Sequence, residues 1–303
     1  MYSVERIIRY ERKAQGISQE KLSDGICSAS YLSRIETGDV RPSSEILEKL
    51  MERLGKQISK YTQFKSETEL KVENLKYEAR RFYTMGNYLM HERCIEQLQL
   101  LEDDEETLFN NQFLRLHQYL LGNKNECSSK KKLEELYDIL KLTKTEVRLE
   151  HISNELLTQD EVILINNIAI QYKDLGEMDI AINLLIELRH YLEKPNIELE
   201  QKRRTYPVVM SNLSKWLSRI SRYIECIEVC DKAIEYCIGC DSHTMLVDAY
   251  FNKGYALANY GMVEQGLKSM KLAYDISIAL KQDEITQIIK QFLKTEYAYA
   301  VEI

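Results

Sequence analysis

Proline and glycine are scarce in this sequence, with only three prolines and eleven glycines among 303 residues. These residue types interrupt regular backbone most often, so a repeating pattern can be broken at few positions. Between those positions, leucine, isoleucine, tyrosine, glutamate and lysine recur at the spacing of amphipathic helices. The sequence therefore predicts an all-α fold.

Long apolar runs are absent as well. No stretch approaches the roughly 18 apolar residues that a membrane-spanning helix needs. The first residues, MYSVERIIRYERK, are charged and amphipathic, whereas a secretory signal has an apolar centre. We therefore expect a cytoplasmic protein with no membrane partner, whose seven cysteines are reduced.

Motifs that carry enzymatic chemistry are missing too. The five histidines are scattered, and the sequence has neither a glycine-rich phosphate loop nor an HExxH motif. We expect no catalytic residues, no cofactor and no metal. Cys226, Cys230 and Cys237 share one helical face, which favours core packing. The alternative is a zinc site formed by Cys237, Cys240 and His243.

Charge differs between the two ends of the chain. Residues 1–58 carry ten Lys/Arg and nine Asp/Glu, whereas residues 59–303 carry 31 and 39. Because an acidic surface repels nucleic acid, any DNA contact is expected from the N-terminal segment.

The stretch SQEKLSDGICSASYLSRIETG, residues 18–38, contains two helix starts. Ser18 is placed to cap a short helix that begins at Gln19, and Gly25 allows the turn that ends it. Ser28 then caps a helix over residues 29–37 that Gly38 stops. The spacing predicts two short helices joined by a tight turn.

The flanking residues complete a four-helix pattern. A helix is expected over residues 4–15, and a further one over residues 45–55 after a cap at Ser43 or Ser44. A tight glycine turn between the second and third of four short helices is typical of a helix-turn-helix.

This segment resembles the XRE (phage-repressor-like) family of DNA-binding domains. The shortened turn over residues 25–28 is similar to the peptide-sensing branch of that family. The residues that carry the resemblance are Gly16-Ile17-Ser18-Gln19-Glu20, Leu22, Tyr31-Leu32-Ser33-Arg34-Ile35-Glu36 and Gly38.

The resemblance implies roles for individual residues. Arg34 is expected to bond a guanine edge, with a phosphate contact as the alternative, and Gln19 and Ser28 to reach phosphates. Arg12 and Glu36 match a pair that bridges two helices in related repressors, so both are expected to be structural. The implied DNA-binding set is Gln19, Ser28, Ala29, Ser30, Tyr31, Ser33, Arg34, Arg41 and Ser43.

Beyond residue 65 the pattern changes to pairs of long amphipathic helices. Three copies have a small residue at a matching position, namely Ala169, Ser214 and Gly254. This arrangement is typical of tetratricopeptide (TPR) repeats, although the spacing is longer than the usual 34 or so residues. A weaker copy starts at Asn74, another pair is expected within residues 107–141, and residues 284–300 are expected to cap the array.

A helix-turn-helix followed by about five TPR-like repeats resembles the RNPP family of peptide-pheromone-responsive regulators, its PlcR-like members most of all. The resemblance implies a DNA-binding domain over residues 1–64 and a right-handed TPR-like α-solenoid over residues 65–303 with a C-terminal capping helix. It also implies a homodimer on a palindromic DNA operator, switched by a short signalling peptide, as in quorum sensing.

The concave face of such an array is where a peptide is expected. Asn167, Asn212 and Asn252 occupy one register position, and their amides form a ladder suited to the backbone of an extended peptide. The alternative is that these asparagines cross-link neighbouring helices. The remaining residues expected on this face are Ile163, Ile170, Lys215, Arg219, Tyr255 and Asn259.

Two other functions stay open. The repeats are also suited to a scaffold that binds a partner protein. Alternatively, the protein is a DNA-binding regulator whose repeats only dimerise.

Overall fold

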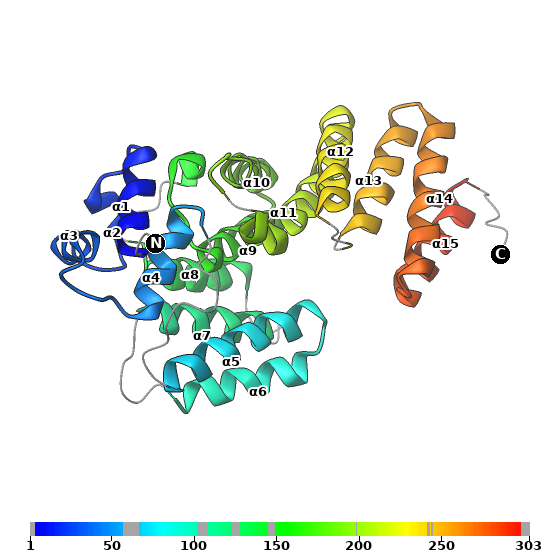
Figure 1. Cartoon of the computed structure of the whole chain (residues 1–303). Coiled ribbons are helices and arrows are strands. Elements are labelled where there is room, and N and C mark those ends of the chain that lie inside the picture. Colours follow the sequence, from blue (N-terminus) through cyan, green and yellow to red (C-terminus); the bar gives the residue numbers. More distant parts are fainter. Residues whose placement is uncertain are drawn as a thin grey trace. The chain divides into compact units, whose positions relative to one another are not determined.

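Helices make up all the regular structure that the computed structural model describes (Figure 1). The described residues are 4–56, 67–101, 108–122, 128–144, 149–197, 199–240, 243 and 245–297. The predicted all-α fold is confirmed. Within these ranges no helix combines the length and the apolar character that crossing a bilayer requires. The domain boundary predicted at residue 64 lies outside the described residues.

The chain divides into two compact units by the contacts that its residues make. Unit 1 comprises residues 1–177 and 194–201, and unit 2 comprises residues 178–193 and 202–303. The helix-turn-helix segment belongs to unit 1, together with the first helix pairs that follow it.

Unit 1 begins with four short helices, of which α1 packs against α3 and α2 packs against α3 and α4. Further along the chain, α5 packs against α6 and α7 packs against α8, so the pairs expected from Asn74 and within residues 107–141 are present as helices. The helices are α1 Val4–Ala14, α2 Gln19–Ser23, α3 Ala29–Thr37, α4 Ser44–Arg53, α5 Glu67–Thr84, α6 Tyr88–Gln99, α7 Leu108–Leu121, α8 Ser129–Leu140, the 3-10 segment η1 Leu149–Asn154, and α9 Gln159–Asp174.

Unit 2 is a run of longer helices, and its last four pack in order, α12 against α13, α13 against α14 and α14 against α15. The predicted capping helix forms α15, while residues 298–300 lie outside the described part. The helices are α10 Met178–Leu192, α11 Leu199–Arg219, whose first three residues belong to unit 1, α12 Tyr223–Gly239, α13 Leu246–Asn259, α14 Val263–Ala279 and α15 Asp283–Tyr297.

The small residues of the repeat pattern lie at tight helix contacts. Ala169 and Ser214 are buried. A Cβ added to Gly254 on α13 would lie 2.5 Å from Cγ of Met270 and 2.6 Å from the carbonyl oxygen of Gly266, both on α14. Only a residue without a side chain permits this approach, so the structure accounts for the small residue at this position.

The helix-turn-helix starts where the sequence predicts. The hydroxyl oxygen of Ser18 accepts the backbone N–H of Lys21, and that of Ser28 accepts the N–H of Tyr31, both at 3.1 Å. Ser43, the first of the two candidates, caps α4. Each cap satisfies a backbone donor that the first helical turn leaves without a partner.

The turn between α2 and α3 needs its glycine for two reasons. Gly25 has a φ of +67°, which side chains disfavour. A Cβ there would also overlap the carbonyl oxygen of Thr143, just beyond α8. The turn is therefore pressed against the backbone of a later segment of unit 1.

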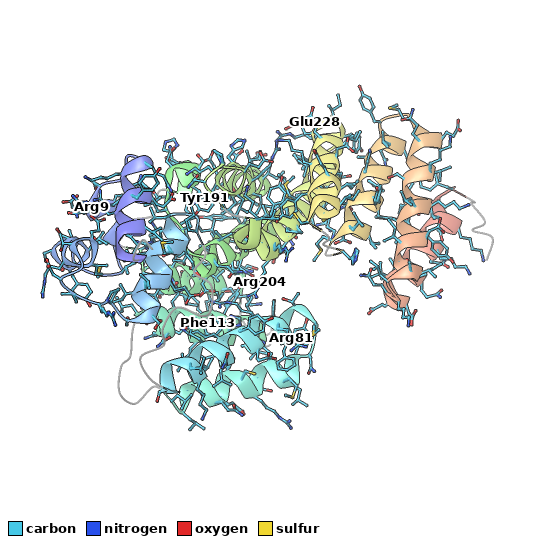
Figure 2. All side chains as sticks on the ribbon, in the orientation of Figure 1. Arg9, Arg81, Phe113, Tyr191, Arg204 and Glu228 are labelled. Atoms are coloured by element: carbon cyan, nitrogen blue, oxygen red, sulfur yellow. The ribbon has the colours of Figure 1, made fainter. Side chains whose placement is uncertain are left out.

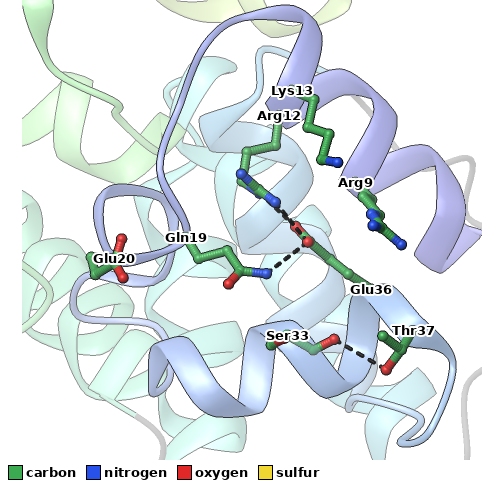
Figure 3. A pocket seen from close by; sticks show the side chains of 8 residues that line it. All are labelled: Arg9, Arg12, Lys13, Gln19, Glu20, Ser33, Glu36 and Thr37. Atoms are coloured by element: carbon green, nitrogen blue, oxygen red, sulfur yellow. Dashed lines mark hydrogen bonds and ion pairs between the residues drawn. The ribbon is translucent and has the colours of Figure 1, made fainter.

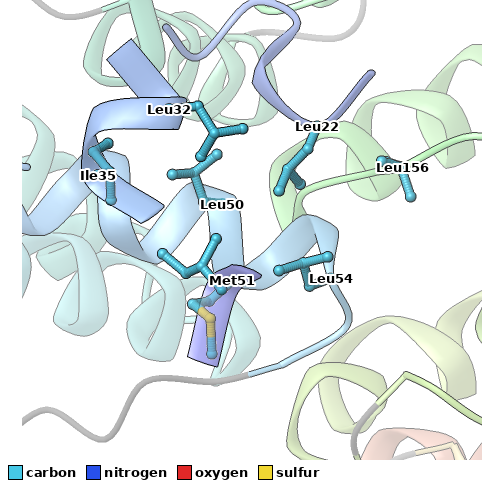
Figure 4. Close-up of a cluster of buried hydrophobic side chains, with 8 residues drawn as sticks. Leu22, Leu32, Ile35, Leu50, Met51, Leu54 and Leu156 are labelled. Carbon is cyan, nitrogen blue, oxygen red and sulfur yellow. The ribbon is translucent and has the colours of Figure 1, made fainter. Parts of the chain in front are cut away.

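One apolar core joins the four short helices (Figure 4). Its last member, Leu156, lies just after η1 rather than in the first four helices. The core of the helix-turn-helix is therefore completed by a residue about a hundred positions further along the chain. The members are Ile8, Leu22, Leu32, Ile35, Leu50, Met51, Leu54 and Leu156.

Buried ion pairs reinforce the contact between the helix-turn-helix and the later helices of unit 1. We call this region the α4 seam. It is formed by Glu48, Lys49, Glu52 and Arg53 of α4 and the groups they face. Lys49 lies 3.9 Å from a carboxylate oxygen of Asp160, and Arg80 of α5 donates to the same carboxylate at 3.0 and 3.1 Å. Burial acts to raise the pKa of Asp160, but Arg80 and Lys49 hold that pKa well below its usual range.

Glu48 experiences the opposite effect in the same seam. Burial and the nearby carboxylate of Glu73 raise the pKa of Glu48 to about 7, against the influence of Lys49. A half-buried carboxyl beside another carboxylate favours its neutral form.

Candidate nucleic-acid interface

Helix α3 has one buried and one exposed face. Leu32 and Ile35 are fully buried, whereas Ser30 and Arg34 are exposed. Their spacing places the two pairs on different sides of the helix. The exposed side carries small and polar residues beside one guanidinium, a composition suited to lying against DNA base edges. The half-buried members of the predicted set on α3 are Ala29, Tyr31 and Ser33.

Arg12 of α1 and Glu36 of α3 form the predicted pair. The guanidinium donates from Nε to Oε1 at 2.6 Å and from a second nitrogen to Oε2 at 2.7 Å. The hydrogen bond to Glu36 raises the pKa of Arg12. Burial acts to raise the pKa of Glu36, but Arg12 and Gln19 hold it below its usual value.

Gln19 belongs to the same cluster. Its amide nitrogen donates to Oε2 of Glu36 at 2.8 Å, so this nitrogen links α2 to α3. The predicted phosphate contact of Gln19 stays a prediction. The Arg12–Glu36 pair and Gln19 together hold three helices in one arrangement.

The residues of this cluster line a pocket of about 290 Å³ (Figure 3). Arg9 and Lys13 of α1 line it, and sequence reasoning did not assign a role to either. Their spacing of four residues on an exposed helix face was the available signal. The full lining is Arg9, Arg12, Lys13, Gln19, Glu20, Ser33, Glu36 and Thr37.

The remaining predicted DNA contacts lie at helix ends. Ser28 caps α3, and its hydroxyl also lies 3.1 Å from that of Ser30. Arg41 is exposed in the connection to α4, and Ser43 caps that helix. Phosphate contacts typically come from such positions.

The predicted peptide-binding residues of unit 1 lie on α9. Asn167 donates from its amide nitrogen to the carbonyl oxygen of Ile163 in its own helix, at 2.8 Å. Ile163, Asn167 and Ile170 are half-buried.

In unit 2, Asn252 is only 8% exposed and donates to the hydroxyl of Ser214 on α11 at 3.0 Å. This bond links two helices, as expected if the asparagines cross-link neighbouring helices rather than bind a peptide. Asn212 is half-buried. Because Asn167 belongs to unit 1, a ladder through all three asparagines stays a prediction.

Other predicted groove residues of unit 2 are accessible. Lys215 pairs with Asp248 of α13 at 3.0 Å, and Arg219 is exposed. Asn259 is exposed and donates to the carbonyl oxygen of Tyr255 at 2.8 Å. The ring of Tyr255 is half-buried, 6.0 Å from that of Phe292 on α15.

The cysteines of α12 pack in the core, as predicted. Cys226, Cys230 and Cys237 are at most 2% exposed. Burial raises the pKa of Cys237 to about 11, which disfavours the thiolate that a metal needs. In the described ranges, no three His, Cys, Asp or Glu side chains are grouped so that they could hold a metal ion.

Residues 8–61 match the helix-turn-helix family. This segment is therefore a helix-turn-helix DNA-binding domain. No curated protein matches the chain.

Solved structures match nearly the whole chain. Bacillus thuringiensis PlcR in complex with the peptide PapR7 and DNA is 22% identical, with a TM-score of 0.62 over 94% of this chain and 98% of that chain. The apo form of PlcR is 21% identical, with a TM-score of 0.60 and the same coverage of both chains. The apo competence regulator ComR from Streptococcus vestibularis is 14% identical, with a TM-score of 0.54 over 97% of this chain and 98% of that chain. The chain therefore has the fold of these proteins.

Proposed function

We propose that this chain is a cytoplasmic, homodimeric transcriptional regulator that binds a palindromic operator and is switched by a short signalling peptide in its repeat groove. The protein is not an enzyme in this proposal. The DNA-binding function rests on the matched domain, whereas the peptide, the dimer and a role in quorum sensing belong to the proposal.

One observation carries the proposal. A helix-turn-helix domain and an array of helix pairs occur in one chain, and that chain has the fold of PlcR over 94% of its length. PlcR with this fold was solved together with a peptide and DNA. A shared fold alone does not establish a shared ligand, so support for peptide binding must come from the side chains of the repeats.

Those side chains suit a short peptide with an acidic group. Arg219 is exposed and forms no ion pair with any residue in the described part of the chain, so its guanidinium is available to a carboxylate. The half-buried ring of Tyr255 and the exposed amide of Asn259 are suited to an apolar side chain and a peptide backbone.

A second candidate function has one observation in its favour. The buried bond between Asn252 and Ser214 assigns that amide to helix packing rather than to a ligand. This arrangement suits a regulator whose repeats only dimerise.

The test selects duplexes from a random library with the full chain and measures their affinity by fluorescence anisotropy. Synthetic peptides from short reading frames beside the gene are then added. The proposal expects an enriched palindrome and at least one peptide that changes its affinity about tenfold. Arg219→Ala should abolish the peptide effect, whereas Lys271→Ala, an exposed residue of α14, should preserve it.

Other outcomes select the alternatives. An enriched palindrome that no peptide affects favours the dimerising regulator. A chain that enriches no duplex contradicts the proposal and favours the scaffold.

A further inference from the structure

We propose that the pocket between α1, α2 and α3 is an anion site that holds one phosphate of the DNA backbone through Arg9 and Lys13. This inference rests on DNA binding by the helix-turn-helix. It adds a contact from α1, a helix to which the sequence assigned no DNA-binding residue.

The two cations are free to bind. Arg9 and Lys13 are both exposed, and neither forms a hydrogen bond or ion pair with a residue that the structure describes. They are four residues apart on α1, so they lie on the same face of that helix. Figure 2 shows Arg9 extending from the surface of α1, and Figure 3 shows both side chains beside the pocket.

Glu36, an acidic residue of the lining, takes its hydrogen bonds from groups other than these two cations, although the charge of Arg9 also helps to lower its pKa. Glu36 already accepts two hydrogen bonds from Arg12 and one from Gln19. Its charge is therefore matched inside the protein, and the charges of Arg9 and Lys13 exceed that of Glu20, the remaining carboxylate of the lining. The pocket carries a net positive charge.

The pocket is placed beside the exposed face of α3. Ser33 and Thr37 line the pocket and are one turn apart on α3, and Arg34 follows Ser33 directly. When such a recognition helix lies in the major groove, groups on its flank meet the phosphates of the groove edge. Because the pocket lies on the flank of α3 beside α1, we expect it to face the DNA backbone.

The chemistry of the lining suits a phosphate. A guanidinium offers several N–H donors in a plane, and an ammonium adds a compact charge beside it. The hydroxyl of Thr37 donates to a carboxylate oxygen of Asp39 at 2.6 Å, so its proton is already used within the protein. The cations therefore dominate recognition, without base specificity.

The test measures how DNA affinity of the full chain depends on salt. Each phosphate contact contributes roughly 0.9 to the slope of log affinity against log salt concentration. Arg9→Gln and Lys13→Gln should each reduce that slope by about 0.5 to 1 and leave the preferred sequence unchanged. Lys271→Gln, an exposed lysine of unit 2, serves as the matched control and should leave the slope unchanged.

A duplex that carries neutral methylphosphonate groups at single positions identifies the partner. One position in each half-site should weaken wild-type binding yet have little effect on the Arg9→Gln variant, because the contact is already lost. Thermal unfolding of both variants should match the wild type, since the two side chains are exposed.

The outcomes separate a failure of the phosphate contact from a failure of the proposed function. Unchanged slopes for both variants overturn the inference, while sequence-specific binding by the wild type keeps the proposed regulator intact. If inorganic phosphate binds the free protein in calorimetry and the slopes are unchanged, the pocket takes free phosphate and the DNA contact is overturned. A wild type without any sequence preference overturns the proposed function itself.

Discussion

Arg53 of α4 donates to the carboxylate of Glu161 on α9 at 3.2 Å, across 108 positions of sequence, and both side chains are fully buried. Arg53 also donates to the carbonyl oxygens of Asp24, beside the helix-turn-helix turn, and Thr143. The DNA-binding helices are therefore joined to the following helices of unit 1 by buried charges.

Arg53→Met should destabilise the full chain by about 3 to 5 kcal/mol, because it leaves the buried Glu161 carboxylate without its cation. The double variant with Glu161→Gln should recover part of that loss. Urea unfolding measures both. Arg93→Met, at an exposed position of α6, is the control. An Arg53→Met protein as stable as this control would show that the pair contributes nothing.

Glu48→Gln should make stability less dependent on pH. The folded pKa of Glu48, about 7, lies above its unfolded value, so the wild type loses stability as pH rises toward 7. We expect Glu48→Gln to be more stable than the wild type by about 2 kcal/mol at pH 8 and nearly equal to it at pH 4.5.

Unfolding free energies at the two pH values provide the measurement. Glu228→Gln, an exposed position of α12 (Figure 2), should track the wild type throughout. If the stability of Glu48→Gln also follows that of the wild type at both pH values, the raised pKa of Glu48 is wrong.

Loss of Arg12 or Glu36 alone should cost more stability than loss of both. Each single alanine variant leaves a partly buried charge without its partner, at a cost of about 3 kcal/mol. The pKa of Glu36 is depressed, so the stabilisation is present above a pH of about 4.3 and is lost as the pH falls through the folded pKa. A double-mutant cycle in urea measures the coupling, and additive single effects would remove the claim.

Gly254→Ala should destabilise unit 2 by about 1 to 3 kcal/mol, because its Cβ would overlap α14. Gly239→Ala, at the end of α12, has open space around the added Cβ and is the matched control. That change should be neutral or slightly stabilising. Thermal unfolding compares the two variants, and equal midpoints would contradict the close contact.

Arg34→Ala should remove base preference at one position of each half-site, worth about 1 to 3 kcal/mol of discrimination. Gln19→Ala should instead weaken all sequences alike. Anisotropy with single-base variants of the selected operator measures both effects. Uniform weakening by Arg34→Ala, with preference retained, would assign Arg34 to a phosphate.

Local sequence was sufficient for features that neighbouring residues specify. The caps at Ser18, Ser28 and Ser43 and the split of α3 into a buried and an exposed face follow from rules that span a few positions. The Arg12–Glu36 pair was predicted across 24 positions only because the motif resembles a known family.

Periodicity alone does not decide which face of a helix a second segment covers. Asn167, Asn212 and Asn252 share a register, yet the amide of Asn252 bonds Ser214 of another helix while that of Asn167 bonds its own helix. A repeat register gives the angle of a residue on its helix, but the neighbouring helix determines whether that angle is buried.

Distance along the chain explains the rest. Leu156 completes the core of the helix-turn-helix, and Glu161 neutralises Arg53, although more than a hundred residues separate each from α4. No short-range pattern marks such a partner, because its position depends on how all the intervening helices pack. Helix starts, faces and the DNA-binding motif were therefore encoded locally, whereas the burial of α4 against later helices arose only from the folded chain.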